Sequence, residues 1–172
     1  MRRITLLIGA GLIAVAAPLA IAAVVVGCAG SSSGYSSGAN GSTVPASGSS
    51  GPAVVGVGQT SLGPILVDGN GRTLYLFEKD TSTTSTCAGD CATFWPPLIT
   101  VGKPVAEDGA LASELGTIKR VDGKAEVSYH GHPLYYYVGD KKTGDTTGQG
   151  LDLFGAEWTA LSAAGTGIDA GS

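Results

Sequence analysis

The sequence is poor in the residues from which enzyme and metal sites are most often built. Its 172 residues include one methionine, two histidines and three cysteines. Because the methionine is Met1, the exported form of the chain would contain no thioether ligand for copper. The sequence also has no nucleophile elbow, no zinc-binding motif and no phosphate-binding loop. We therefore expect a protein that is not an enzyme and that needs no cofactor.

Dense clusters of basic residues are absent as well. Beyond the arginines at positions 2 and 3, basic side chains are adjacent only in the pairs 119–120 and 141–142. Loss of the first two arginines with the N-terminus leaves 10 − 2 = 8 basic against 14 acidic side chains, a formal net charge of −6. Nothing in this pattern resembles a basic patch for nucleic acid or anionic lipid, so we expect no nucleic-acid partner.

The N-terminal segment has the pattern of a bacterial export signal. Two arginines precede an apolar stretch over residues 4–26, and Gly27 and Cys28 follow it. Positive charge, an apolar core and small residues before the processing point are typical of secretory signals. The order Val-Val-Gly-Cys is that of a lipobox, in which the thiol is acylated and the chain is cut before it. We expect residues 1–27 to be removed and Cys28 to carry lipid; an uncut membrane helix over 4–26 is the alternative.

Segments without large apolar side chains lie on both sides of the central part of the chain. Residues 28–52 are mostly Gly and Ser, and residues 163–172 are small and polar. Such segments cannot offset the entropy of ordering by burying apolar surface. We therefore expect a flexible linker over 28–52, one domain over 53–162 and a flexible tail over 163–172. The domain would lie on the extracytoplasmic face of the cell membrane, attached through the lipid on Cys28.

The central part contains an internal repeat. Residues 67–80 can be laid over residues 127–140 at an offset of 60. The identical pairs are Val67/Val127, Gly71/Gly131, Leu74/Leu134, Tyr75/Tyr135 and Asp80/Asp140, and Phe77 faces Tyr137. A repeat of this length is one supersecondary unit that needs its neighbour to bury an apolar face. The domain should consist of two pseudo-repeats, at about 53–100 and 117–162.

Local signals are those of β-strands almost throughout. Residues 63–77 form two apolar runs around a Gly-rich turn, and residues 118–129 form two runs around Asp122-Gly123, a pair that favours a tight hairpin. The second hairpin would continue through 134–138 as a meander. Only residues 108–115 could form a helical turn. The sequence therefore predicts an all-β fold, a compact antiparallel meander, sandwich or small barrel built from two pseudo-repeats.

Two cysteines remain once Cys28 is assigned to the lipid. Cys87 and Cys91 are four positions apart, and in an oxidising exported context they would most simply form a disulfide. The alternative is a redox or copper site in which both thiolates bind one ion. His130 and His132 keep that alternative open, because a His-x-His pair on a strand points two imidazoles to one side.

The repeated aspartates allow two interpretations. Asp80 and Asp140 each follow an aromatic strand, where Asp commonly accepts hydrogen bonds from the backbone amides that follow it. Alternatively, each carboxylate pairs with a tyrosine hydroxyl to frame a pocket, since a buried tyrosine needs a polar partner. Asp140 also lies near Asp145 and Asp152, but their spacing departs from the calcium-binding loop pattern.

The repeats resemble a known family. Residues 75–80 and 135–140 are similar to the Tyr-x-(Phe/Trp/Tyr)-x-x-Asp motif of predicted bacterial lipoproteins built from tandem secreted repeats. The segment from Cys87 to Leu98 and the segment 131–148 resemble the flanks of that motif. The likeness covers about residues 54–162, and residues 149–154 look like a small insertion. The resemblance implies an exported, lipid-anchored repeat protein and leaves the activity open, because the family's function is unknown.

The sequence thus favours an exported lipoprotein that acts as a non-catalytic binding or envelope-associated module. The motif residues that would carry such a role are Tyr75, Phe77, Asp80, Tyr135, Tyr137 and Asp140. A copper- or redox-handling protein that uses Cys87, Cys91, His130 and His132 is one alternative, and a purely structural envelope protein is another. The expected partners are the membrane, through the lipid on Cys28, and a protein or small molecule that the sequence does not identify. We expect a monomer.

Overall fold

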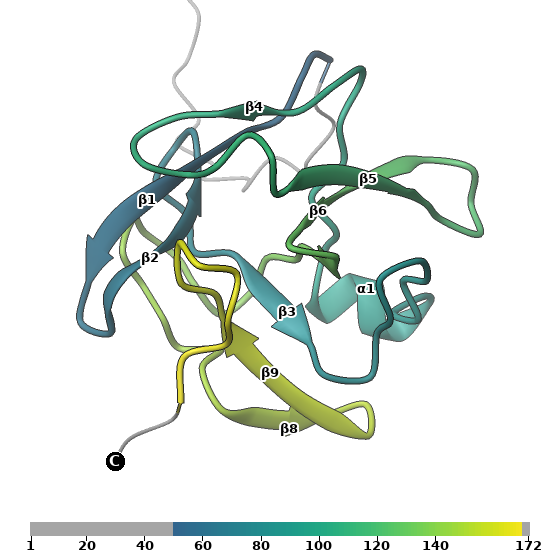
Figure 1. The fold of residues 1–172 in the computed structure, drawn as a ribbon. Helices are drawn as coiled ribbons and strands as arrows, with labels where there is room; N and C mark the ends of the chain where they lie inside the picture. The colour runs from purple at the N-terminus through teal and green to yellow at the C-terminus, as the bar shows by residue number, and fades with distance from the viewer. Residues whose placement is uncertain (1–49, 170–172) are drawn as a thin grey trace, which may run out of the picture. The chain divides into compact units, whose positions relative to one another are not determined.

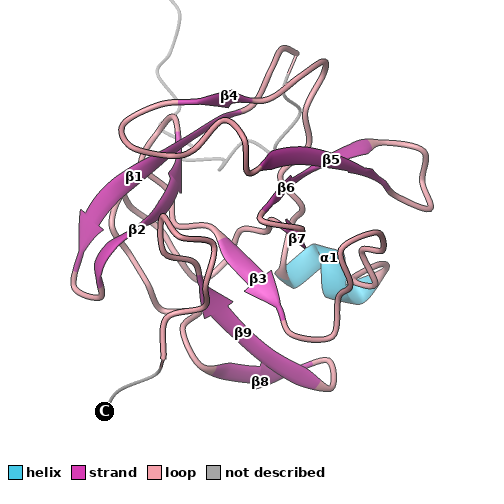
Figure 2. Cartoon of the chain, in the orientation of Figure 1, coloured by secondary structure: helices cyan, strands magenta, loops and turns pink. Residues whose placement is uncertain are grey.

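The computed structural model describes residues 50–169 and confirms the all-β fold. Nine short strands form three small sheets, with one helix of five residues, and the described residues form no closed barrel (Figures 1 and 2). The predicted signal peptide, Cys28 and most of the predicted linker lie outside the described residues. The elements in chain order are β1 (Val54–Thr60), β2 (Gly63–Asp68), β3 (Tyr75–Phe77), α1 (Asp90–Phe94), β4 (Val105–Ala106), β5 (Leu115–Lys119), β6 (Ala125–Tyr129), β7 (His132–Pro133), β8 (Leu151–Leu153) and β9 (Ala156–Ala160).

Each repeat begins with a β-hairpin. In the first repeat, β1 pairs antiparallel with β2, and the two-residue strand β4 joins the other edge of β1 in parallel. In the second repeat, β5 pairs antiparallel with β6 across the predicted turn at Asp122-Gly123, and β7 continues the meander. Gly123 has a φ of +83°, a value that glycine adopts without strain. The turn chemistry therefore specifies this second hairpin.

The aromatic strand of each repeat pairs with a strand of the other repeat. β3 of the first repeat lies antiparallel to β9 of the second, with Phe77 opposite Trp158 (Figure 1). In the same way, residues 134–138 of the second repeat lie against residues 94–98 of the first, where Val138 N donates to Phe94 O at 3.0 Å. At the centre, Tyr75 and Tyr135 exchange backbone hydrogen bonds of 2.9 Å in both directions. The two repeats are thus interlocked rather than stacked side by side.

The helix is not where the sequence pattern placed it. Within 108–115, the expected helical turn, residues 108–109 and 112–114 form turns and Leu115 begins β5. Asp108 and Gly109 have left-handed φ values of +48° and +94°, which a helix does not accommodate. The helix is instead α1, and Trp95 N donates to Cys91 O at its end. Among the described residues, no helix is long and apolar enough to cross a membrane.

The turn after the first hairpin is one residue longer than its counterpart in the second repeat. Leu74 N donates to Leu66 O at 3.1 Å, whereas Leu134 N donates to Val127 O at 3.0 Å. Leu66 is therefore the structural equivalent of Val127, and Ile65 is the equivalent of Glu126. The ungapped overlay at an offset of 60 holds from Gly71 onward and is displaced by one residue before it.

The buried side chains form two clusters. One is mainly aliphatic and lies between the hairpins of the two repeats; it includes Val55, Leu66, Val127 and Leu161. The other is mainly aromatic and lies where the repeats interlock; it includes Tyr75, Trp95, Tyr135 and Trp158. Tyr75, Leu76 and Phe77 are all at most 2% exposed, so both faces of β3 are buried, as its apolar pattern predicts.

Residues 163–169, part of the expected flexible tail, turn back onto the end of β9. Ser162 N donates to Thr166 O at 2.9 Å, and Ile168 N donates to Ala160 O at 2.8 Å. Gln149 also reaches this segment, where its Nε2 donates to Ile168 O at 2.6 Å. Gly165 permits the turn with a φ of +78°.

Candidate functional site

The repeated tyrosines and aspartates meet across the interface between the repeats. The Tyr75 hydroxyl donates to Asp140 Oδ2 at 2.8 Å, and the Tyr135 hydroxyl donates to Asp80 Oδ2 at 2.5 Å. Each repeat thus supplies the tyrosine of one pair and the aspartate of the other. We call these four residues the Tyr–Asp clasp.

Each aspartate of the clasp also closes its own loop. Asp80 Oδ1 accepts hydrogen bonds from the backbone N and hydroxyl of Thr86 at 2.7 and 2.6 Å. Asp140 Oδ1 accepts the same two bonds from Thr147 at 2.9 and 2.6 Å. Both hydrogen-bonding patterns considered for these aspartates are therefore present at once, one through each carboxylate oxygen. The match between the two loops shows that the repeats share this geometry in detail.

Both clasp tyrosines are fully buried. Burial raises the pKa of Tyr75 far above its ordinary value, and the hydrogen bond and charge of Asp140 raise it further. Burial likewise raises the pKa of Tyr135, together with the charges of Glu126 and Asp80. The hydroxyls stay protonated at neutral pH and act as hydrogen-bond donors. Because each hydroxyl is buried and bonded to the aspartate of the other repeat, the pair fastens the two repeats together.

Four aromatic rings stack in the core beside the clasp. Trp95 and Trp158 lie face to face with centroids 4.0 Å apart and an interplanar angle of 3°. Phe77 covers the outer face of Trp158 at 4.1 Å, and Tyr137 covers Trp95 at 4.5 Å. In both cases the outer ring and the tryptophan that it covers come from different repeats. Phe77 and Tyr137, the remaining motif residues, therefore bind the two repeats together through apolar contact.

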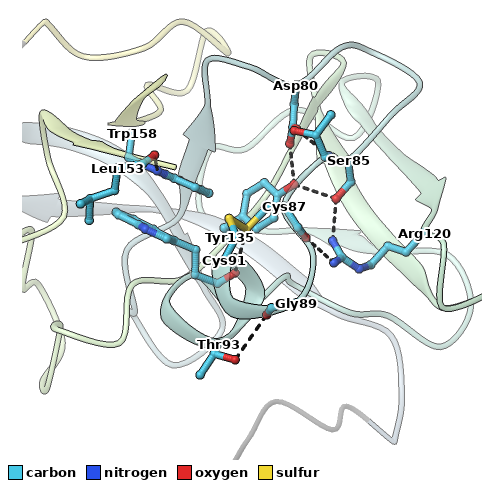
Figure 3. Close-up of a disulfide and its surroundings, with 12 residues drawn as sticks. Asp80, Ser85, Cys87, Gly89, Cys91, Thr93, Arg120, Tyr135, Leu153 and Trp158 are labelled. Atoms are coloured by element: carbon cyan, nitrogen blue, oxygen red, sulfur yellow. Dashed lines mark hydrogen bonds between the residues drawn. A yellow bond between two sulfur atoms is a disulfide. The ribbon is translucent and has the colours of Figure 1, made fainter. Parts of the chain in front are cut away.

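Cys87 and Cys91 form a disulfide with a Cα–Cα distance of 5.2 Å. It closes a loop of four positions, so its contribution through the unfolded chain is about 2 kcal/mol. Both cysteines are buried, and the Cys87 carbonyl accepts a hydrogen bond from Arg120 (Figure 3). The two sulfur atoms are joined to each other inside the aromatic cluster and do not face solvent as thiolates.

A buried ion pair beside the disulfide is absent from the candidates named by sequence reasoning. Arg120 Nη1 lies 2.7 Å from Glu126 Oε2. It also lies 2.5 Å from Ser85 Oγ, which in turn bonds the Tyr135 hydroxyl (Figure 3). Glu126 is fully buried, and its Oε1 has no hydrogen-bond partner among the described residues. The signal was weak, because an Arg and a Glu that flank a hairpin turn look like surface residues.

The two charges of this pair respond differently to burial. Burial raises the pKa of Glu126 to about 7, against the opposing attraction of Arg120. Burial disfavours the charged form of Arg120, but its hydrogen bond to Glu126 and the attraction between them outweigh this and raise the pKa of the guanidinium. Arg120 therefore stays charged, while Glu126 changes its charge near neutral pH.

The residues of the copper alternative are not gathered around one point. His130 Nδ1 lies 2.8 Å from Glu114 Oε2, and His132 is in β7. Within residues 50–169, no group of three or more His, Cys, Asp and Glu side chains is placed to hold a metal ion. Asp145, from the calcium pattern, accepts hydrogen bonds from the backbone of Lys141 and Lys142 through its Oδ2 and so closes a turn.

The outer faces of the interlocked strands differ between the two halves. On the β3–β9 side, a cleft of about 510 Å³ is lined by three acidic side chains. Its lining residues are Glu78, Glu157, Thr159, Gly167, Ile168 and Asp169. On the other side, the equivalents of Glu78 and Glu157 are Val138 and Phe94, which are 36% and 50% exposed.

An exposed hairpin tip extends this apolar side. Phe154, at the tip between β8 and β9, is 40% exposed, and its ring lies 6.0 Å from that of Phe94. It has a φ of +62°, which is unfavourable for a bulky L-residue, and Gly155 follows at +92°. We call Phe94, Val138, Leu153 and Phe154 the distal apolar surface. The turn holds an aromatic residue where Asn or Gly would be less strained.

The paired geometry agrees with comparisons against known proteins. A family model described as a secreted repeat of unknown function matches residues 56–99 and 116–162, which together make up more than half of the chain. The two matches coincide with the two interlocked units seen in the fold. No curated protein and no solved structure matches the chain. The chain therefore belongs to this family of secreted repeats.

Proposed function

We propose that the protein is attached to the outer face of the cell membrane by lipid on Cys28 and acts there as a non-catalytic binding module. The family is one of secreted proteins, which agrees with the export signal in residues 1–27. The lipobox order before Cys28 supports the lipid attachment. The fold supports the non-catalytic role, because the residues of the family motif are occupied with one another.

The reciprocal Tyr–Asp clasp is the observation that carries this proposal. In each pair, one carboxylate oxygen is bonded to the tyrosine of the other repeat, and the second oxygen is bonded to the loop that follows the aspartate. The tyrosine hydroxyls are buried, and both oxygens of each carboxylate are engaged inside the protein. The repeated Tyr and Asp residues then stabilise the fold, and other residues on the protein surface contact the partner.

The mass of the exported protein tests the anchor. Protein extracted from membranes with detergent should give an N-terminal peptide that begins at Cys28 and carries acyl chains. The matched Cys28→Ser variant should appear in the aqueous fraction without acyl chains. An unmodified N-terminal peptide that starts at another residue would refute the lipid attachment.

Native mass spectrometry separates the binding module from the copper alternative. The exported chain should be two hydrogens lighter than its reduced form and should gain no copper when Cu(I) is added under mild reductant, because the disulfide is buried. A stoichiometric copper adduct that disappears on Cys87→Ser, or on replacement of both histidines, would overturn the proposal in favour of metal handling. Replacement of the remote residue Asp152 by Ser serves as the control.

A further inference from the structure

The fold places one loop and one hairpin beside the point where the described chain begins. Gly51 O accepts a hydrogen bond from Val101 N at 3.2 Å, and Ala53 O accepts one from Val105 N at 2.9 Å. The next hairpin is tied to the same loop, since Thr100 N donates to Ala125 O at 3.0 Å. The 101–105 loop and the tip of the β5–β6 hairpin therefore lie near the junction with the linker.

This part of the surface carries exposed valines and lysines. Val121, at the hairpin tip, is 87% exposed, and Val101 and Val105 are 57% and 42% exposed. Lys103, Lys119 and Lys124 are exposed as well. We call these six residues the linker-side surface. Lysines that are separate in the sequence are thus brought together by the pairing of the loop with the hairpin.

The charge of the linker-side surface is only partly neutralised within the protein. Lys124 lies 3.6 Å from Asp122, which also lies 4.0 Å from the buried Arg120. Within residues 50–169, neither Lys103 nor Lys119 forms an ion pair. On a chain that is acidic as a whole, a local excess of lysine among exposed valines suits an apolar layer covered by negative charge.

We infer that the linker-side surface docks on the anionic headgroup layer of the membrane that holds the protein, an inference that rests on the proposed anchor at Cys28. Between Cys28 and Pro52 the sequence has 23 residues, mostly Gly and Ser, and flexible Gly/Ser chains of that length have a root-mean-square span of roughly 25 Å. At that range, the tether supplies a high effective concentration of lipid, so that a weak surface contact is populated. The valines enter the interface and the lysines lie against lipid phosphates.

The distal apolar surface is not the membrane contact under this inference. One end of it is the β8–β9 hairpin, which lies on the opposite side of the fold from β4 (Figure 1). Docking through the linker-side surface would leave the tip of this hairpin away from the bilayer. The two surfaces therefore give different predictions for the segments that the membrane covers.

Hydrogen exchange on a chemically tethered protein tests the orientation. The chain from Cys28 onward would be coupled through the Cys28 thiol to a maleimide lipid in vesicles, while Cys87 and Cys91 are protected by their disulfide. In vesicles of phosphatidylglycerol and phosphatidylcholine, amides in 99–105 and 119–125 should exchange about threefold more slowly, as for a surface bound two thirds of the time. Vesicles of phosphatidylcholine alone should give no such protection.

Two matched variants make the result specific. Val101→Asp with Val121→Asp should abolish the protection, and because both side chains are mostly exposed, folding should be unaffected. Phe94→Asp with Leu153→Asp, the control on the distal apolar surface, should retain it. Equal exchange with and without vesicles, equal protection on neutral lipid, or protection at 151–156 instead would overturn the inference. The chemical tether makes this outcome independent of acylation by the cell, which the mass of the extracted protein decides.

Discussion

The two repeats place different residues at the same buried position. Ile65 and Glu126 are both fully buried and structurally equivalent, yet one is aliphatic and the other is half of an ion pair with Arg120. The surrounding clasp and aromatic stack are nevertheless the same in both halves. The fold is therefore specified by the interlocked tyrosines, aspartates and tryptophans, and the positions around them are free to take different chemistry.

The outer faces of the repeats support the same conclusion. Glu78 and Glu157 line an acidic cleft in one half, and their equivalents Val138 and Phe94 form an apolar surface in the other. The backbone pairing is equal on both sides, so it requires neither charge nor apolarity there.

Removal of one charge from the buried pair should have the largest effect on stability. Arg120→Met leaves Glu126 buried without its partner and should lower the free energy of unfolding by about 3 to 5 kcal/mol. The double variant Arg120→Met with Glu126→Ile places the isoleucine of the first repeat at position 126 and removes both charges, so it should recover most of that loss. Urea denaturation measures both, and a double variant as unstable as the single one would show that the halves are not interchangeable here.

The same ion pair should make the stability of the protein depend on pH through the second repeat alone. Burial raises the pKa of Glu126 from 4.5 to about 7, so the folded protein keeps a proton that the unfolded chain releases between these values. The contribution of Glu126 to stability is then fully present below pH 4.5 and declines by about 1.4 kcal/mol per pH unit as the pH approaches 7, about 3 kcal/mol in total. In Glu126→Gln, the plot of the free energy of unfolding against pH should lack this component. A plot unchanged from that of the wild type would show that Glu126 does not cause the pH dependence.

Removal of the hydroxyl from either clasp tyrosine should lower the free energy of unfolding by a smaller amount, and the two amounts should differ. Tyr135→Phe removes the donor to Asp80 and a partner of Ser85, and should cost about 2 kcal/mol. Tyr75→Phe removes the donor to Asp140 and a weak contact with Gly148 N at 3.3 Å, and should cost about 1 kcal/mol. Thermal unfolding of the two variants gives the order, and the reverse order would indicate that the buried ion pair does not extend to Tyr135.

The strained turn should give the smallest effect, and it should be a gain. Phe154→Asn replaces a bulky residue at a left-handed φ by one that tolerates it and should stabilise the protein by about 1 kcal/mol. Phe94→Asn, on the same surface but outside the turn, should give no gain. If Phe154→Asn destabilises instead, the ring contact with Phe94 outweighs the strain.

The sequence predicted those features that depend on neighbouring residues. The Asp122-Gly123 hairpin and the Cys87–Cys91 disulfide are both confirmed. The first follows from local turn chemistry and the second from cysteine spacing. The repeat itself was visible because the aromatic motif is nearly identical in both copies.

Features that depend on which repeat supplies the partner were not predictable from the sequence. A repeat indicates two similar units, but it does not tell whether Tyr75 bonds Asp80 or Asp140. The buried pair of Glu126 and Arg120 was hidden by a turn that is one residue shorter in the second repeat, which made an ungapped overlay match Ile65 with Ala125. Such contacts are decided by the register of strands distant in the sequence.

The interlocked clasp has a consequence for the ancestry of the chain. One repeat by itself holds the tyrosine of one pair and the aspartate of the other, so neither of these two groups has its Tyr–Asp partner in the same unit. A gene that encoded a single repeat would need two copies of its product, related by a twofold axis, to complete the same core. Duplication and fusion of such a gene would place both units in one covalent chain, so that the core no longer depends on association between molecules. After that, the outer residues of each repeat could change independently of those of the other repeat.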